Sequence, residues 1–132
     1  MVKIVLTSVF VDDQQKALRF YTEKLGFQKK SEYPAGEFKW LTVVSAEEPD
    51  GTELYLEPNN NPAAKALQHS LKEKGVFAAN FFVDDVQREY DRLVGLGVKF
   101  TMPPTKAPWG SMAMLDDTCG NLIQLTKLAW GG

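Results

Sequence analysis

Two carboxylates and a phenol alternate along the stretch Thr52–Glu57. In an extended strand, Glu53, Tyr55 and Glu57 project from one face because the side-chain period of a strand is two. Flanked by Trp40 and Tyr55, a partly desolvated Glu53 is a candidate general base. The same carboxylate is also a candidate group for binding an amine or a hydroxyl of a ligand.

These carboxylates also have purely structural interpretations, which the sequence leaves open. Glu57 precedes Pro58 and is compatible with a position at the solvent rim. Glu53 can be satisfied by a hydrogen bond from Ser8 or Gln124, with no chemical role. Replacing Glu53 by Gln should weaken ligand binding if the carboxylate recognises a ligand.

The other residues that commonly carry chemistry are sparse. The chain has one His and one Cys. His69 is predicted to point to solvent from a linker helix, away from the helix's apolar stripe. Cys119 lies before Gly120 in a predicted turn with no His near it, so a small turn residue is expected in place of a nucleophile. A lone Cys also excludes an internal disulfide and a Cys-rich zinc site.

Length and charge limit the function classes. The chain has 132 residues, a hydrophobic fraction of 44% and a formal net charge of −2, which predicts one globular domain. No stripe of Lys and Arg is present, so nucleic-acid binding is not expected. No apolar run approaches the ~20 residues of a membrane span, and the N-terminal residues do not resemble a signal peptide. A cytoplasmic protein without membrane association is therefore predicted.

An internal repeat predicts the architecture. The segment Val9–Asp13 (VFVDD) returns 72 positions later as Phe81–Asp85 (FFVDD), and each copy runs into a helical pattern that ends near a Gly, at Gly26 and Gly97. The paired Asp residues suit a helix N-terminus because their carboxylates accept from free backbone N–H groups. Helix capping therefore explains both pairs without a catalytic dyad.

Each half then continues into three strands, so an α+β fold of two βαβββ modules is predicted. The modules span residues 1–58 and 76–132, joined by a linker helix within 59–75, in one domain of residues 1–132. The later strands are predicted at Gln28–Tyr33, Lys39–Ser45 and Thr52–Glu57, then at Val98–Met102, Ser111–Leu115 and Leu122–Lys127.

Alternation along the strands separates a core face from a second face. In the first strand, Val5, Thr7, Val9 and Val11 are assigned to the core. The opposite faces carry more aromatic side chains than a wetted surface requires, which favours a concave, partly apolar pocket. These aromatic residues are Phe10, Phe38, Trp40, Tyr55 and Phe82.

The strings VFVDDQQKALRFYTEKLGF and DDTCGNLIQL, with the second VDD segment, resemble the vicinal-oxygen-chelate superfamily, which includes glyoxalases, bleomycin-resistance proteins and extradiol dioxygenases. The resemblance covers essentially the whole chain. It implies paired βαβββ modules whose curled mixed sheets form a cup, commonly in a homodimer. It also implies a divalent metal that holds two neighbouring substrate oxygens in the enzymes.

The metal positions of that superfamily fall on Leu6, Glu53, Ala78 and Gln124 in this chain. A catalytic metal normally has about three protein ligands, whereas an aliphatic chain and a methyl group cannot coordinate. Ser8 and Asn80, two residues further along, are weak oxygen donors. The resemblance therefore implies a member without the usual metal site and with no expected cofactor, although a divalent metal remains the alternative.

Three functions follow. The first is a metal-free protein that binds an unidentified small molecule in an aromatic-lined cup, with Trp109 in a Pro-flanked loop that covers it. The second is a divergent metal-dependent lyase or dioxygenase-like enzyme that uses Glu53. The third is a degenerate fold kept for protein–protein contact. We favour the first, and its candidate ligand-binding residues are Ser8, Phe10, Trp40, Tyr55, Glu57, Asn80, Phe82, Trp109 and Gln124.

Overall fold

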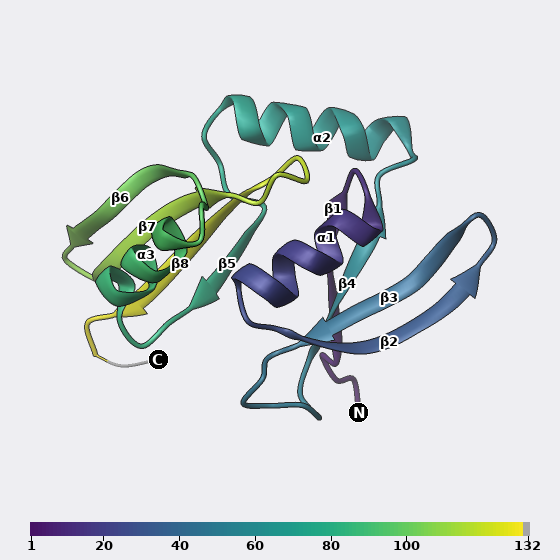
Figure 1. Cartoon of the computed structure of the whole chain (residues 1–132), viewed down its shortest axis with the longest axis horizontal. Helices are drawn as coiled ribbons and strands as arrows, with labels where there is room; N and C mark the ends of the chain where they lie inside the picture. Colours follow the sequence, from purple (N-terminus) through teal and green to yellow (C-terminus); the bar gives the residue numbers. More distant parts are fainter. Residues whose placement is uncertain (131–132) are drawn as a thin grey trace. The chain divides into compact units, whose positions relative to one another are not determined.

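The computed structural model describes residues 1–130 and contains two compact units, Met1–Leu67 and Gln68 to the C-terminus (Figure 1). Each unit holds a four-stranded sheet. The first contains β1 (Leu6–Val11), α1 (Gln14–Arg19), the π-helical turn η1 (Phe20–Lys24), β2 (Gln28–Ala35), β3 (Phe38–Val44) and β4 (Glu53–Pro58). After α2 (Pro62–Glu73), the second contains β5 (Ala79–Phe82), α3 (Val86–Gly95), β6 (Phe100–Ala107), β7 (Gly110–Asp116) and β8 (Leu122–Leu128). The predicted α+β fold with two βαβββ halves is confirmed.

The two sheets have the same topology. The strand order is β1-β4-β3-β2 in the first unit and β5-β8-β7-β6 in the second. In each, the first strand pairs in parallel with the last strand of the unit, and the other pairs are antiparallel. A parallel pair needs a crossover connection, and the connection between β1 and β4 begins with α1, whereas that between β5 and β8 begins with α3. The helix therefore follows the first strand in both halves.

Both crossover helices begin at the second Asp of the repeated motif. The Asp13 carboxylate accepts from the backbone N–H of Lys16 at 3.0 Å, and the Asp85 carboxylate accepts from that of Arg88 at 3.1 Å. The hydrogen bond from Lys16 also lowers the pKa of Asp13. Helix capping is confirmed for the second Asp of each pair, and the predicted left-handed ends occur at Gly26 and Gly97, with φ of 88° and 87°.

Each unit has its own apolar core between helix and sheet. In the first, Val11, Ala17, Tyr21, Leu41 and Leu56 are fully buried, and α1 contacts β3 and β4. In the second, α3 contacts β6, β7 and β8, with Val86, Leu93, Leu115 and Ile123 buried. The aliphatic side of the strands is therefore the core side, as the alternation predicts.

The core assignment for the first strand is wrong at its N-terminal half. Val9 and Val11 are buried, but Val5 lies before β1 and is 61% exposed, and Thr7 is also exposed. β1 is an edge strand of its sheet, and α1 packs on β3 and β4. The beginning of β1 therefore receives little cover from the helix.

The strand predicted at Val98–Met102 is placed too early and is too short, because β6 continues to Ala107 through Pro103 and Pro104. Proline lacks the N–H that an interior strand must donate. β6 is at the edge of its sheet, and its register with β7 shifts between Met102 and Thr105. The edge position and this irregularity together accommodate the two prolines.

The linker helix begins at Pro62, as predicted, and Gly75 follows its end with φ of 71°. The Asn61 side chain accepts from the backbone N–H of Ala63 at 2.8 Å. In the part of α2 that belongs to the second unit, Gln68 is buried and His69 is exposed. Among residues 1–130, no helix has the length and apolar character that crossing a membrane requires.

Candidate functional site

The face of the first sheet that turns away from α1 brings together most of the predicted ligand-binding residues of that unit. The parallel register pairs Ser8 with Tyr55 and Phe10 with Glu57. Thr42 pairs with Tyr55 across β3 and β4, so Trp40, two residues before Thr42, shares this face. We call it the aromatic face. It is defined by the side chains of Ser8, Phe10, Trp40, Thr42, Glu53, Tyr55 and Glu57.

Two rings of the aromatic face stack on each other. The centroids of Trp40 and Tyr55 are 4.5 Å apart, and the ring planes are inclined by 28°. Both side chains are only partly buried. A stacked pair on a sheet is stabilised by ring electrostatics as well as by burial. The pair therefore forms a preorganised platform whose outer surface is suited to a further planar group.

The Glu53 carboxylate is held by a partner that the sequence did not identify. The Thr42 hydroxyl donates to Glu53 Oε1 at 2.6 Å, and Thr42 is fully buried. Ser8, a partner considered from the sequence that lies in the same unit, makes no such bond to Glu53 in the hydrogen bonds described. Strand alternation alone puts Thr42 on the same face as Trp40, but only the pairing of β3 with β4 brings it to Glu53.

Tyr55 lies between the two carboxylates of β4. Burial raises the pKa of its phenol, and the negative charge of Glu57 raises this pKa further. Both effects disfavour the phenolate. At neutral pH the Tyr55 hydroxyl is therefore a neutral group that can donate a hydrogen bond, beside a carboxylate that can accept one.

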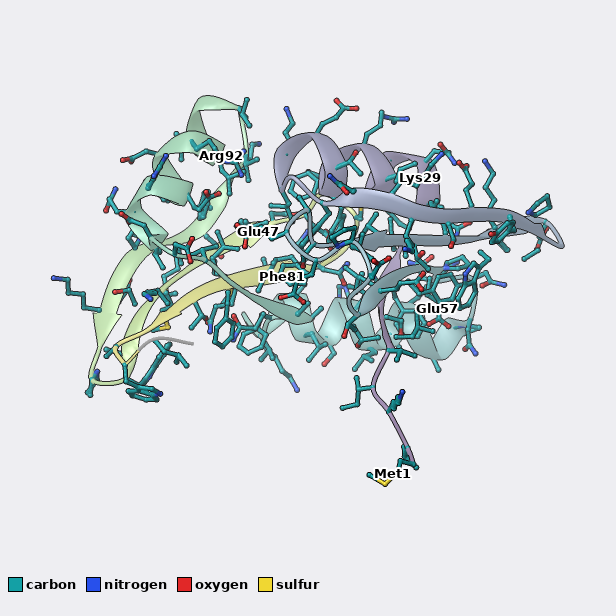
Figure 2. The ribbon with its side chains drawn as sticks, turned by 90° about the horizontal axis from the view of Figure 1, so that it is seen from below. Met1, Lys29, Glu47, Glu57, Phe81 and Arg92 are labelled. Carbon is teal, nitrogen blue, oxygen red and sulfur yellow. The ribbon has the colours of Figure 1, made fainter. Side chains whose placement is uncertain are left out.

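Two lysines of the first sheet, Lys29 and Lys39, lie on its other face. Lys39 and Lys29 contact the Glu32 carboxylate at 2.7 Å and 2.9 Å. Hydrogen bonds from Lys39, Lys29 and Gln15 lower the Glu32 pKa to about 2. Lys39 follows Phe38 in β3 and so alternates with Trp40. Figure 2 shows Lys29 on the α1 side of the sheet and Glu57 on the opposite side.

The second sheet presents a different set of groups on its corresponding face. Asn80 pairs with Gln124, and Phe82 pairs with Thr126. The Thr126 hydroxyl donates to Asn80 Oδ1 at 2.7 Å, and the Gln124 amide donates to Thr126 at 3.4 Å. Gln124 is 8% exposed, whereas Phe82 is 54% exposed. We call this set, with Met112 and Met114 of β7, the amide face.

Trp109 lies in a short hairpin turn, whereas the predicted strands left a loop from Met102 to Ser111. β6 ends at Ala107 and β7 begins at Gly110, so Trp109 occupies the two-residue turn of a hairpin. Its carbonyl accepts from the backbone N–H of Ala129 at 2.9 Å. The loop prediction was wrong because two adjacent prolines indicate a break in most strands but are tolerated in this irregular edge strand.

The DDTCGN segment is a structural turn. The buried Asp117 carboxylate accepts from the backbone N–H groups of Cys119 and Asn121 at 2.7 Å and 3.0 Å, and from the Asn121 side chain at 2.8 Å. Gln68 of α2 donates to the Cys119 carbonyl and to Asn121 Oδ1. Cys119 is a buried turn residue, as predicted. The fixed geometry of Asp117 could not be read from the motif alone.

His69 contributes no buried ligand. Its side chain is 82% exposed and lies 3.1 Å from Glu73, one turn along α2. The prediction of a solvated histidine is confirmed.

Comparison with known proteins identifies the family. A model of the Glyoxalase/Bleomycin resistance protein/Dioxygenase superfamily matches residues 3–125. The chain belongs to this superfamily. It is 55% identical to YurT of Bacillus subtilis (strain 168), an uncharacterized protein, over 125 residues that cover 95% of this chain and 98% of YurT.

Two solved structures show the same fold over nearly the whole length. UcmS2 is 30% identical with a TM-score of 0.82, over 96% of this chain and 98% of that chain. TnmS3, an antibiotic-binding protein from Streptomyces sp. CB03234, is 29% identical with a TM-score of 0.75, over 98% of each chain. The fold and the family expected from the VDD and GNxIxL motifs are confirmed.

The strand registers show which positions of the two halves correspond. Asn80 is the repeat counterpart of Ser8, and it pairs with Gln124. Ser8 itself pairs with Tyr55. The repeat therefore aligns Tyr55 with Gln124, and Glu53 lies two residues before this position. Glu53 pairs instead with Leu6 at the beginning of β1.

A divalent metal of the superfamily's enzymes does not fit this donor set. Leu6 and Ala78 have no donor atom, Tyr55 is a phenol with a raised pKa, and Gln124 is a neutral amide. Among residues 1–130, no three His, Cys, Asp or Glu side chains are grouped so that they could hold a metal. Glu53 supplies only one carboxylate ligand at these positions, whereas a catalytic metal typically has about three protein ligands.

Proposed function

We propose that this protein binds an aromatic small molecule on the aromatic face of its first sheet, and that binding requires no metal. The observation that carries the proposal is the Trp40–Tyr55 stack, with centroids 4.5 Å apart on partly buried side chains. A planar ligand adds a third ring to a stack that is already formed, so little side-chain freedom is lost on binding.

The position of the stack supports a recognition role. Two large aromatic rings beside Phe10 are not expected on a sheet face whose only role is to be exposed to solvent. Polar groups that fix the orientation of a ligand lie next to the rings: the Tyr55 hydroxyl and the carboxylates of Glu53 and Glu57. An apolar surface with a few placed polar groups is typical of small-molecule sites.

The likeness to TnmS3 supports the same class of function. That protein is described as antibiotic-binding, and it is 29% identical to this chain over 98% of both chains. This likeness is consistent with a small-molecule ligand for this chain. The cytoplasmic location and the homodimer inferred above remain predictions.

The alternative, a metal-dependent lyase or dioxygenase-like enzyme that uses Glu53, is less well supported. The Glu53 Oε1 atom already accepts the Thr42 hydroxyl, and the other family positions offer an aliphatic group, a methyl group and an amide. A Lewis acid needs several ligands that hold it while a site stays open for substrate. We therefore assign Glu53 to binding.

The test is a calorimetric titration of the protein with acridine, a neutral three-ring probe, in the presence of EDTA. We expect saturable binding that EDTA leaves unchanged. Replacing Trp40 by Ala should weaken it about tenfold, because a stacked ring pair and its buried area are lost. Trp130→Ala is the matched control, since Trp130 is 73% exposed and belongs to the second unit.

Binding that disappears with EDTA and returns with zinc or manganese would contradict the metal-free proposal. Equal affinity of the Trp40→Ala and Trp130→Ala variants would show that the aromatic face is not the site.

A further inference from the structure

The charges around the Trp40–Tyr55 stack have one sign. Of the side chains that the register places on the aromatic face, the charged ones are Glu53 and Glu57, both on β4. Across β2 and β3, the residues opposite Trp40 and Thr42 are Tyr33 and Ser31, which are neutral. The face therefore combines stacked rings with two carboxylates, and the residues that these registers place on it include no cation.

The basic side chains of this sheet are engaged elsewhere. Lys29 and Lys39 bind Glu32 on the α1 side. Lys30, at the register shift of β2, contacts Asp50 and the Pro49 carbonyl in the connection between β3 and β4. None of these contacts brings an ammonium group to Glu53 or Glu57.

Both carboxylates are placed to act on a ligand stacked on Tyr55. Glu53 and Glu57 lie on either side of Tyr55 in the strand, and both are partly buried. Thr42 binds one oxygen of Glu53 and so fixes the direction of that carboxylate. Glu57 is close enough to the Tyr55 phenol for its charge to raise the phenol's pKa.

We infer that the ligand of the aromatic face is a cation: a planar aromatic molecule that carries a protonated amine or a delocalised positive charge. This inference rests on the proposed function. The ring faces of Trp and Tyr attract a cation through their quadrupole, and two partly desolvated carboxylates add Coulombic attraction that water screens less than at an exposed site. A neutral ligand would gain only the stacking, and an anion would be repelled.

The experiment compares three probes that share one ring system: 9-aminoacridine, which is cationic at neutral pH, acridine, which is neutral, and acridine-9-carboxylate, which is anionic. Affinities are measured by calorimetry at low salt. We expect 9-aminoacridine to bind about tenfold more tightly than acridine, and the carboxylate to bind most weakly, from a cation–π and ion-pair contribution of about 1.4 kcal/mol. Added salt should reduce this preference.

Three variants remove the same charge from different places. Glu53→Gln and Glu57→Gln should each weaken the binding of 9-aminoacridine more than that of acridine, and so reduce the preference for the cation about threefold. Glu37→Gln, in the exposed turn between β2 and β3, is the control and should change neither. Glu57→Gln keeps the inference testable if a weaker bond from Thr42 disturbs the Glu53 variant.

The outcomes separate this inference from the proposed function. If all three probes bind with similar affinity and Trp40→Ala weakens them all, the aromatic site stands and the charge preference is wrong. If the preference survives in the Glu53→Gln/Glu57→Gln double variant, these carboxylates do not cause it. If none of the probes binds, the proposed function fails and this inference fails with it.

Discussion

The two halves of the chain share their construction but differ in what they present. In both halves, the second Asp of the VDD segment caps the helix that follows the first strand. A Gly with positive φ follows the helical segment, and the first and last strands pair in parallel. The aromatic face of the first half carries a ring stack with two carboxylates. The amide face of the second half carries a hydrogen-bonded row of Asn80, Thr126 and Gln124. The repeated segments therefore specify the backbone fold of both halves, whereas the residues at alternate strand positions specify the functional groups that each face presents.

The connections before the last strands differ as well. The second half uses a turn organised by the buried Asp117 carboxylate. In the first half, the connection from Ser45 to Thr52 is mostly exposed, and the Asp50 side chain is 98% exposed. Stability should therefore depend much more on the second connection than on the first.

The largest expected effect tests this contrast. Asp117→Ala leaves the N–H groups of Cys119 and Asn121 without their acceptor in a buried turn, and should lower the free energy of unfolding by about 2–4 kcal/mol. Asp50→Ala should lower it by less than about 0.5 kcal/mol, because an exposed pair contributes little. Urea unfolding followed by circular dichroism measures both. Similar losses for the two variants would contradict the comparison.

A carboxylate should be tolerated on one face and not on the other. Gln124→Glu places a charge where the side chain is 8% exposed, so we expect a loss of about 1–3 kcal/mol at neutral pH. Glu53→Gln retains an acceptor for the Thr42 hydroxyl and should cost less than about 1 kcal/mol. Thermal unfolding of both variants at one pH provides the measurement. A stable Gln124→Glu variant would show that the amide face accepts charge.

The helix caps should be equivalent in the two halves. Asp13→Ala and Asp85→Ala each remove one hydrogen bond to the first helical turn and should each cost about 1 kcal/mol. The comparison uses urea unfolding with the two single variants side by side. A cost at one cap only would mean that the repeat is not energetically symmetric.

The smallest effect concerns acid stability and belongs to the first half. The Glu32 pKa of about 2 lies below its ordinary value of 4.5 because Lys39, Lys29 and Gln15 bind the charged form. A lowered pKa contributes stability above about pH 4.5 that is lost as the pH falls towards 2. Glu32→Gln should therefore flatten the loss of stability across this window. Glu37→Gln should not, and an unchanged slope in the Glu32 variant would contradict the assignment.

Much of the fold was predictable from the sequence. The VDD repeat, the Gly residues that end the helices and the alternation in the strands are local signals, and they predicted both halves. The position of Trp40 and Tyr55 on one face also followed from alternation, although their contact did not.

The features that the sequence missed depend on pairing between distant segments. The bond from Thr42 to Glu53 requires the register of β3 with β4, and the counterpart of Gln124 in the first half required the registers of both parallel pairs. The extension of β6 through Pro103 and Pro104 depends on its place at a sheet edge. No local pattern specifies any of these.

The central claim is that the first sheet carries an aromatic site that needs no metal. The most direct test is a titration of ¹⁵N-labelled protein with 9-aminoacridine in the presence of EDTA. The indole N–H signals of the three Trp residues report where the ligand binds. We predict that the Trp40 indole N–H shifts with the ligand, together with the amides of Tyr55 and Glu57, while the indoles of Trp109 and Trp130 stay in place. Shifts confined to Trp109 or Trp130, or shifts that require an added divalent metal, would contradict the account.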